Sequence, residues 1–348
     1  MTTTSNADQR LQGLEQWLAS LPGPPVRRVT PASVDASFRR YFRVHRDDGT
    51  QIAMDAPPER EGLDTYLQVA GLLAGTGLHV PEVLAADAKR GYVLISDLGN
   101  LQYLEALNKG ADPEPLYADA IDALLQLQAA GTPDAGDLPL YDDAMLRREM
   151  ELFPEWFIGR HLGLQANADD RRAIASAFDW LCGQALAQPV VLVHRDYHSR
   201  NLMVCTHRNP GILDFQDAVR GPIAYDLVSL LKDCYIVWPR AQLLAWLDRY
   251  RAGAAQLGLD AGGSREEFLR WFDHIGLQRH IKVLGIFARL CYRDGKSGYL
   301  ADLPRTLDYV LDTAARYQEL QGFNAWARRR LQPGLAAANA RALGGMRA

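Results

Sequence analysis

The sequence predicts an α+β protein of two lobes, with a five-stranded antiparallel sheet in the amino-terminal lobe and a mainly helical carboxyl-terminal lobe. The chain has 348 residues, which exceeds the usual size of one domain and favours two lobes with a substantial apolar core. Short strand-like segments gather before residue 98, and beyond about residue 100 the helical period of apolar residues dominates. We therefore expect the boundary near Leu98, with lobes at residues 1–98 and 99–348.

The amino-terminal lobe contains two helical patterns and five strand patterns. In chain order the expected elements are a helix over residues 7–20, strands over 26–30, 38–44 and 51–56, a helix over 60–76, and strands over 80–87 and 91–98. The sequence LPGPP ends the first helix. The turn RDDGT contains an Asp-Gly pair that is typical of a β-hairpin.

The carboxyl-terminal lobe is helical apart from one β island at residues 189–215, where three short apolar strands surround a polar turn, HRNPG. The expected helices span 101–107, 113–130, 142–162, 169–187, 224–235, 239–257, 265–292 and 304–330. The end of the chain, AAANARALGGMRA, is of low complexity, and we expect it to fray or be disordered.

Composition argues against several classes of protein. A net charge of -4 gives no electrostatic footprint for nucleic acid. The four cysteines are widely separated, without metal or disulfide-framework spacing, which fits a reducing cytosol. The polar amino terminus is unlike a signal peptide, and no apolar run could span a bilayer. We therefore expect a cytoplasmic protein with no membrane, nucleic-acid or obligate protein partner.

The β island contains the pattern HxDxxxxN from His194 to Asn201, followed by Asp214 in the sequence ILDF. Phosphoryl transfer requires a carboxylate that orients the attacking hydroxyl and accepts its proton, and hard oxygen ligands that place Mg²⁺ at the phosphates. We assign the first role to Asp196 as the catalytic residue, and the metal to Asn201 and Asp214. His194 is expected to hold the loop by hydrogen bonding rather than to act as a second base.

With these residues in place, the chain resembles the aminoglycoside-phosphotransferase and choline-kinase branch of the protein-kinase-like fold. The resemblance rests on HRDYHSRN, ILDFQDA and GPIAYDLVSLLKD. The segments ASFRRYFRV, MDAPPE and LFPEWFIGRHLG are similar to bacterial N-acetylmuramate/N-acetylglucosamine anomeric kinases. The resemblance implies a bilobal kinase-like fold, ATP and Mg²⁺ as cofactors, and nucleotide binding by residues 1–98. Asp226 lies at the expected start of a helix, where it could cap that helix or brace the catalytic loop.

The nucleotide site departs from the usual kinase pattern at two places. The turn between the first two strands has no glycine, although its small residues could let backbone amides approach phosphate. The strand QIAMDA has no lysine, so either Arg40 or Arg43 replaces it, or both are solvated strand arginines. The residues expected at the nucleotide are Ser33, Ala36, Ser37, Arg40, Arg43, Ser96 and Leu98.

Four of the residues expected at the acceptor lie on the helix over 142–162, which Pro154 interrupts and whose counterpart in the resembled family forms the acceptor pocket. The residues expected at the sugar are Glu151, Trp156, Arg160, His161, His198, Gln216 and Asp217. The alternative is a half-buried helix with ordinary core aromatics. A muramate carboxylate would need a cation from Arg147, Arg160 or Arg279, which the sequence does not rank.

The resemblance implies phosphorylation of the anomeric C1 hydroxyl of N-acetylmuramate and N-acetylglucosamine in peptidoglycan recycling. A kinase for an aminoglycoside, choline or another metabolite remains open. A nucleotide-binding pseudokinase scaffold is favoured by the missing lysine and opposed by the three intact motif residues. A protein kinase is disfavoured, because Gln216 stands where DFG has glycine and no APE sequence follows.

Overall fold

A computed structural model describes residues 6–34, 39–60 and 62–345 of the chain. The chain forms two compact units, one of residues 1–134 with 200–218 and the other of residues 135–199 with 219–348. The predicted lobe boundary at residue 98 lies inside the first unit, and the assignment of nucleotide binding to residues 1–98 remains a prediction. No helix in the described part of the chain is both long enough and apolar enough to cross a membrane.

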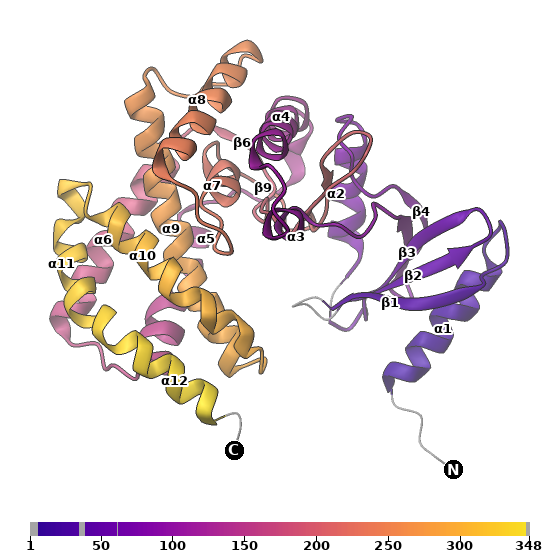
Figure 1. Cartoon of the computed structure of the whole chain (residues 1–348), viewed down its shortest axis with the longest axis horizontal. Coiled ribbons are helices and arrows are strands. Elements are labelled where there is room, and N and C mark those ends of the chain that lie inside the picture. Colours follow the sequence, from indigo (N-terminus) through magenta and orange to yellow (C-terminus); the bar gives the residue numbers. More distant parts are fainter. Residues whose placement is uncertain (1–5, 35–38, 61, 346–348) are drawn as a thin grey trace. The chain divides into compact units, whose positions relative to one another are not determined.

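The first unit contains a five-stranded antiparallel sheet, which confirms the predicted strands (Figure 1). Its spatial order is β1-β2-β3-β5-β4. The strands are β1 (Arg28–Val34), β2 (Arg40–Arg46), β3 (Gly49–Asp55), β4 (Val83–Asp87) and β5 (Tyr92–Ser96). The register places Arg40 opposite Asp55, at the ends of two neighbouring strands.

Helix α1 (Asn6–Ser20) covers one face of this sheet. The apolar residues of the helix recur at helical spacing, so they form one stripe. Alternate residues of a strand point to the same face, and the core therefore combines that stripe with side chains from β2, β3 and β5. Its buried members are Leu14, Trp17, Leu18, Phe42, Val44, Ala53, Tyr92 and Leu94.

The remainder of the first unit consists of three helices and a hairpin from later in the chain. The helices are α2 (Asp64–Ala74), α3 (Tyr103–Asn108) and α4 (Pro113–Gly131). The hairpin pairs β7 (Leu202–Met203) with β8 (Gly211–Ile212), as the β island predicted. Backbone hydrogen bonds from Ile212 N to His79 O (2.8 Å) and from Val204 N to Leu101 O (2.7 Å) attach it to the rest of the unit.

The second unit is helical, with a two-stranded pair of β6 (Val190–Val193) and β9 (Val219–Pro222). Its helices are α5 (Asp143–Met150), α6 (Ala168–Leu186), α7 (Tyr225–Leu231), α8 (Arg240–Gln256), α9 (Arg265–Tyr292), α10 (Leu303–Ala314), α11 (Gln321–Arg330) and α12 (Leu335–Gly345). Short 3₁₀ turns lie at Ala135–Asp137, Ser297–Asp302, Gln318–Leu320 and Gln332–Gly334. Helix α9 is the central element, because it is buried along most of its length and packs against the π-helix η2 (Phe153–His161), α6 and α10.

Two predicted helices of this unit differ from the structure, and one strand was not predicted. The single helix expected over 142–162 is α5 followed by η2, in which Leu162 N donates to Phe157 O five residues earlier (2.9 Å). Pro154 lacks the amide hydrogen that a regular helix needs, which accounts for the break. The helix expected over 304–330 is divided into α10 and α11. Strand β9 was not predicted.

The carboxyl-terminal segment expected to fray forms α12 instead. Its apolar residues Leu335 and Ala338 are buried. Asn339, which follows Ala338 in the sequence, makes two polar contacts. Its Nδ2 donates to Leu300 O (3.1 Å), and its Oδ1 lies 2.8 Å from His161 Nε2. A small apolar stripe and one polar anchor therefore order a segment whose composition suggested disorder.

Candidate active site

The predicted catalytic loop, residues 194–199, follows β6 in the second unit and is held at its start by Asp226. This carboxylate, on the first turn of α7, accepts hydrogen bonds from the backbone amides of His194 (2.6 Å) and Arg195 (2.9 Å). Arg195 has a φ of 75°, a left-handed conformation that is unfavourable for a side chain with a Cβ. The structure confirms the predicted bracing of the loop by Asp226, which offsets the cost of this backbone conformation.

The far end of the loop is held by a second buried carboxylate, Asp233, just after α7. It accepts from the backbone amide of Ser199 (3.0 Å) and from the hydroxyl of the same residue. Within the loop, Asp196 N lies 3.3 Å from His194 Nδ1, in line with the hydrogen-bonding role expected for that histidine. Asp196 therefore lies between two fixed ends. The sequence analysis did not identify Asp233.

A network of buried charged residues is attached to the loop through Arg195. Glu149 on α5 pairs with the guanidinium of Arg195 and, through Oε2, with Lys282 Nζ on α9 (3.0 Å). The same ammonium donates to Tyr225 Oη (3.2 Å). Burial alone would raise the pKa of Glu149, but Lys282 and Arg195 lower it below its ordinary value, so it stays ionised.

This network also sets the charge state of Asp196, whose side chain is partly exposed. Burial would raise the pKa of Asp196, but the positive charges of Lys282, His198 and Arg195 lower it. An ionised carboxylate at neutral pH can accept a proton from a hydroxyl. Lys282 was not expected at the site. Its only signal in the sequence is a charged residue inside the apolar pattern HIKVLGIF, in a chain with five lysines.

Asp226 contrasts with Asp196 in the same part of the unit. It is fully buried, and burial raises the pKa of Asp226 to about 7 although two backbone amides donate to it. The negative charge of Asp196 acts in the same direction as burial. Asp226 therefore holds the backbone, while Asp196 carries the negative charge at the partly exposed position.

The predicted metal ligands lie on the hairpin of the first unit. Asn201 Nδ2 is 3.3 Å from Asp214 Oδ2, and Gln216 Nε2 donates to Asp214 Oδ1 (2.8 Å). The backbone bond from Leu213 N to Asn201 O (2.9 Å) brings the two residues together, and Asp214 has a φ of 63°. An aspartate beside an asparagine offers a carboxylate and an amide oxygen as hard ligands for Mg²⁺, which takes few protein ligands and completes its shell with phosphate and water. The residues present fit this ion.

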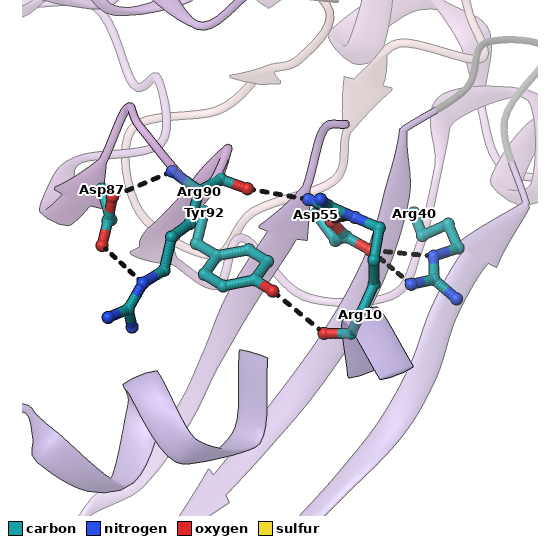
Figure 2. Close-up of polar contacts among 6 residues, drawn as sticks. All are labelled: Arg10, Arg40, Asp55, Asp87, Arg90 and Tyr92. Carbon is teal, nitrogen blue, oxygen red and sulfur yellow. Dashed lines mark hydrogen bonds and ion pairs between the residues drawn. The ribbon is translucent and has the colours of Figure 1, made fainter. Parts of the chain in front are cut away.

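At the end of β3, the strand that lacks the usual kinase lysine, Asp55 lies between two arginines (Figure 2). Arg10 Nε donates to Asp55 Oδ1 (2.8 Å) and Arg40 Nε to Asp55 Oδ2 (3.0 Å). The Asp55 side chain is fully buried, whereas a third of the Arg40 side chain is exposed (33%). The group of three carries a net charge of +1, which is the charge of the missing lysine.

The other candidate for the lysine's role, Arg43, is more constrained. Its guanidinium binds Asp97 through Nε (2.6 Å) and Nη2 (3.1 Å), and Nη2 also donates to Gly99 O (3.0 Å). Its side chain is 18% exposed. Arg39 is a further cation that sequence analysis missed: Arg39 and Asp214 both influence the hydroxyl of Tyr66, whose pKa is raised by burial and whose ring stacks on Phe215 (5.1 Å).

The remaining residues expected at the nucleotide have mixed outcomes. Ser96 Oγ accepts from Glu82 N (2.9 Å), and Leu98 O lies 3.6 Å from Cys205 Sγ. Ser33 belongs to β1. Ala36 and Ser37 lie outside the described residues.

The residues expected at the sugar belong to both units, and their surroundings differ. On η2, Trp156 is half-buried with Arg160 over its ring (5.9 Å), and both Glu151 and Arg160 are exposed. His161 is buried, and each of its ring nitrogens makes a hydrogen bond within the fold. Nδ1 contacts Tyr292 Oη (3.1 Å) and Nε2 contacts Asn339 Oδ1 (2.8 Å). In the first unit, Asp217 is exposed, and Gln216 contacts Asp214.

His198 lies at one end of a row of aromatic rings in the second unit. Its ring is 5.7 Å from Tyr235, which is 6.1 Å from Phe287, which is 5.2 Å from Tyr299. Tyr235 and Tyr299 are partly exposed. Aromatic rings near the predicted catalytic carboxylate form an apolar surface of the kind that lines small-molecule sites. The sequence analysis named only His198 from this row.

The chain is similar to known phosphotransferases and kinases. Residues 28–269 match the phosphotransferase enzyme family. The chain is 47% identical over 324 residues to N-acetylmuramate/N-acetylglucosamine kinase of Pseudomonas aeruginosa, covering 90% of this chain and 94% of that protein. It is 44% identical over 316 residues to the protein of the same name from Neisseria meningitidis serogroup B, covering 90% and 93%.

Solved structures show the same fold at low identity. A spectinomycin phosphotransferase bound to AMP has a TM-score of 0.62 at 15% identity, covering 88% of this chain and 99% of the other. A macrolide 2'-phosphotransferase from Brachybacterium faecium has a TM-score of 0.55 at 17% identity, covering 87% and 98%. These similarities confirm the predicted kinase-like fold class. The chain belongs to the phosphotransferase enzyme family, and it is a small-molecule kinase.

Proposed function

We propose that this kinase transfers the γ-phosphoryl group of ATP to the anomeric C1 hydroxyl of N-acetylmuramate and N-acetylglucosamine, in the cytoplasmic recycling of peptidoglycan. The observation that carries the proposal is Asp196, a partly exposed carboxylate on a loop that Asp226 and Asp233 hold at its two ends, where the positive charge of Lys282 lowers its pKa. The relatives named N-acetylmuramate/N-acetylglucosamine kinase support the choice of sugar, since the identity extends over 90% of this chain.

In this mechanism Asp196 orients the C1 hydroxyl and accepts its proton as the oxygen attacks phosphorus. An anomeric hydroxyl is more acidic than an ordinary alcohol because the ring oxygen withdraws charge. A carboxylate of low pKa is therefore an adequate base when the transition state is loose and positioning dominates. The braces from Asp226 and Asp233 supply that positioning.

Asn201 and Asp214 would hold Mg²⁺, which when bound neutralises charge that develops on the phosphates. For the nucleotide we propose that Arg40 takes the place of the strand lysine. Its side chain is more exposed than that of Arg43, and the cluster with Arg10 and Asp55 has the charge of one lysine. Ser96 and Leu98, at the end of β5, remain proposed nucleotide contacts.

The decisive experiment identifies the product. The purified chain is incubated with ATP, Mg²⁺ and each sugar, and the product is examined by ³¹P and ¹H NMR. We expect phosphate coupled to H1 and loss of the reducing end in step with ADP formation. A 6-phosphate with an intact reducing end, or turnover of choline or an aminoglycoside in preference to both sugars, would contradict the assignment of the acceptor.

A further inference from the structure

Arg279, on the central helix α9, is the one arginine of the described residues that is almost completely buried, with 5% of its surface exposed. Within the same described ranges its guanidinium makes a single hydrogen bond, from Nη1 to Cys234 Sγ at 3.7 Å, and no ion pair. Thiol sulfur is a weak acceptor. A buried guanidinium without a carboxylate partner is costly, because the solvation that it loses is not replaced.

The buried cation lies beside the catalytic loop. Its contact Cys234 stands between Asp233, which binds Ser199, and Tyr235, whose ring packs against His198. The negative charge of Asp196 also acts on Arg279. Arg279 is therefore next to the residues that would meet the acceptor.

The exposure of α9 shows which way this side chain points. Most residues between Ile275 and Leu284 are 0% or 1% exposed, whereas Arg279, Lys282 and Val283 are 5%, 9% and 8% exposed. Ile286 is more exposed still. These positions recur every three or four residues, so they form one stripe along the helix. Arg279 thus lies on the least buried stripe of this stretch of α9, together with Lys282, whose positive charge acts on Asp196.

The other two candidate cations, and the two cations of the network at the loop, already have contacts of their own. Arg195 and Lys282 share Glu149. Arg147 pairs with Asp143 (2.8 Å) and Asp179 (2.7 Å) on the surface. Arg160 is exposed over Trp156. Arg279 is the candidate for which a bound anion would supply the partner that the fold lacks.

We propose that Arg279 binds the carboxylate of the lactyl ether of N-acetylmuramate and so determines the preference for this acidic sugar over N-acetylglucosamine, which has no such group. The inference rests on the proposed function. A guanidinium fork matches the two oxygens of a carboxylate, and a charged pair of this kind is strong where water is excluded. The ring of either sugar would pack on the aromatic row from His198 to Tyr299.

The test compares the parent with Arg279→Gln and Arg279→Lys, and with Arg270→Gln as the matched control. Arg270 is on the same helix but on the surface, where it pairs with Glu319 (2.6 Å). For each enzyme kcat/KM is measured with both sugars. We expect the ratio of muramate to glucosamine values to fall about tenfold or more in Arg279→Gln, because a charged partner is lost. Arg279→Lys should fall less, and Arg270→Gln should keep the parent ratio.

A ratio in Arg279→Gln within about twofold of the parent, with both sugars affected alike, overturns this inference and leaves the proposed function standing. A parent that phosphorylates neither sugar overturns both. Since the glutamine variant could fail to fold, a second arm uses the parent with the methyl ester of N-acetylmuramate. The ester removes the charge and adds one methyl group, so it should lose at least as much as the variant does. An ester that performs as well as the acid also overturns the inference.

Discussion

The catalytic loop of the second unit and the metal hairpin of the first hold their aspartates in different ways. Around Asp196 the loop is fixed by buried carboxylates, Asp226 and Asp233, and supported by the pair of Glu149 and Lys282. Around Asp214 the contacts come from side-chain amides, Asn201 at 3.3 Å and Gln216 at 2.8 Å. Both aspartates follow a strand, and each has a left-handed residue at or next to it, Arg195 and Asp214 itself.

The difference matches the two tasks. A base must keep its negative charge and its position without help from a ligand. The protein itself must therefore supply the cations that keep the base ionised and the contacts that hold its backbone. A metal ligand is completed by the ion, and neutral amide donors are weaker than charged ones and can be replaced. The expected consequences of mutation therefore differ: the loop should respond in kcat and pH profile, and the hairpin in its requirement for divalent metal.

The largest effect is expected for Asp196→Asn. The change removes the proton acceptor and the negative charge while preserving shape, so kcat should fall by about three orders of magnitude. Steady-state kinetics with either sugar measures the loss. Thermal unfolding should be close to that of the parent, and the sugar KM should move little if it reports binding. Near-normal turnover in this variant would remove Asp196 from the role of base.

Asp214→Ala tests the hairpin side of the comparison. A direct carboxylate ligand cannot be replaced by water without misplacing the phosphates, so activity should be lost at Mg²⁺ concentrations that saturate the parent. Asn201→Ala should be milder, with residual activity that needs more Mg²⁺. A titration of Mg²⁺ against initial rate distinguishes the two variants. Turnover by the parent in the presence of excess chelator would contradict the metal-dependent mechanism itself.

Lys282→Met tests whether the positive charge of Lys282 keeps Asp196 ionised. Asp196 must be ionised to accept a proton, and Lys282 is the strongest of the cations that lower its pKa. Removing this positive charge raises the pKa of the carboxyl group, so the acid limb of kcat/KM should move to higher pH by about one pH unit. The matched control is Lys109→Met, an exposed lysine of the first unit that pairs with Glu105 (2.6 Å). If both profiles overlay that of the parent, Lys282 has no part in setting the charge of Asp196.

Much of the fold could be predicted from local pattern. The five strands follow from alternation, an Asp-Gly turn and apolar runs, and long-range packing did not override these signals. The break at Pro154 is a different case, because the sequence shows where a regular helix must fail but not that a π-helix continues it. Helix α12 was missed because its order depends on burial of Leu335 and Ala338 and on the Asn339 contact with His161, none of which is local.

The site residues also divide into those that a local pattern predicts and those that only long-range contacts reveal. A local sequence pattern predicts Asp196, Asn201 and Asp214, because phosphoryl transfer requires these residue types. Their supports are contributed by distant segments: Glu149 lies 46 residues before Arg195 along the chain, and Asp233 lies 34 residues after Ser199. The sequence names Arg279 as one of three candidate cations, but only the absence of an ion pair among its described neighbours separates it from Arg147.

The smallest effect that we predict distinguishes the two strand arginines. Arg40→Ala should raise the KM for ATP about tenfold, because an exposed guanidinium that would meet the phosphates is lost. Arg10 remains to compensate Asp55 in this variant, which limits the cost to stability. Arg43→Ala should change the KM for ATP by less than about threefold, since its donors are engaged by Asp97 and Gly99 and its loss is an ordinary structural one. ATP titrations at saturating sugar give both values, with thermal unfolding as the control for folding. Two variants that both match the parent would return Arg40 and Arg43 to purely structural roles, and Arg39, near Tyr66 and the metal hairpin, would be the next candidate to test.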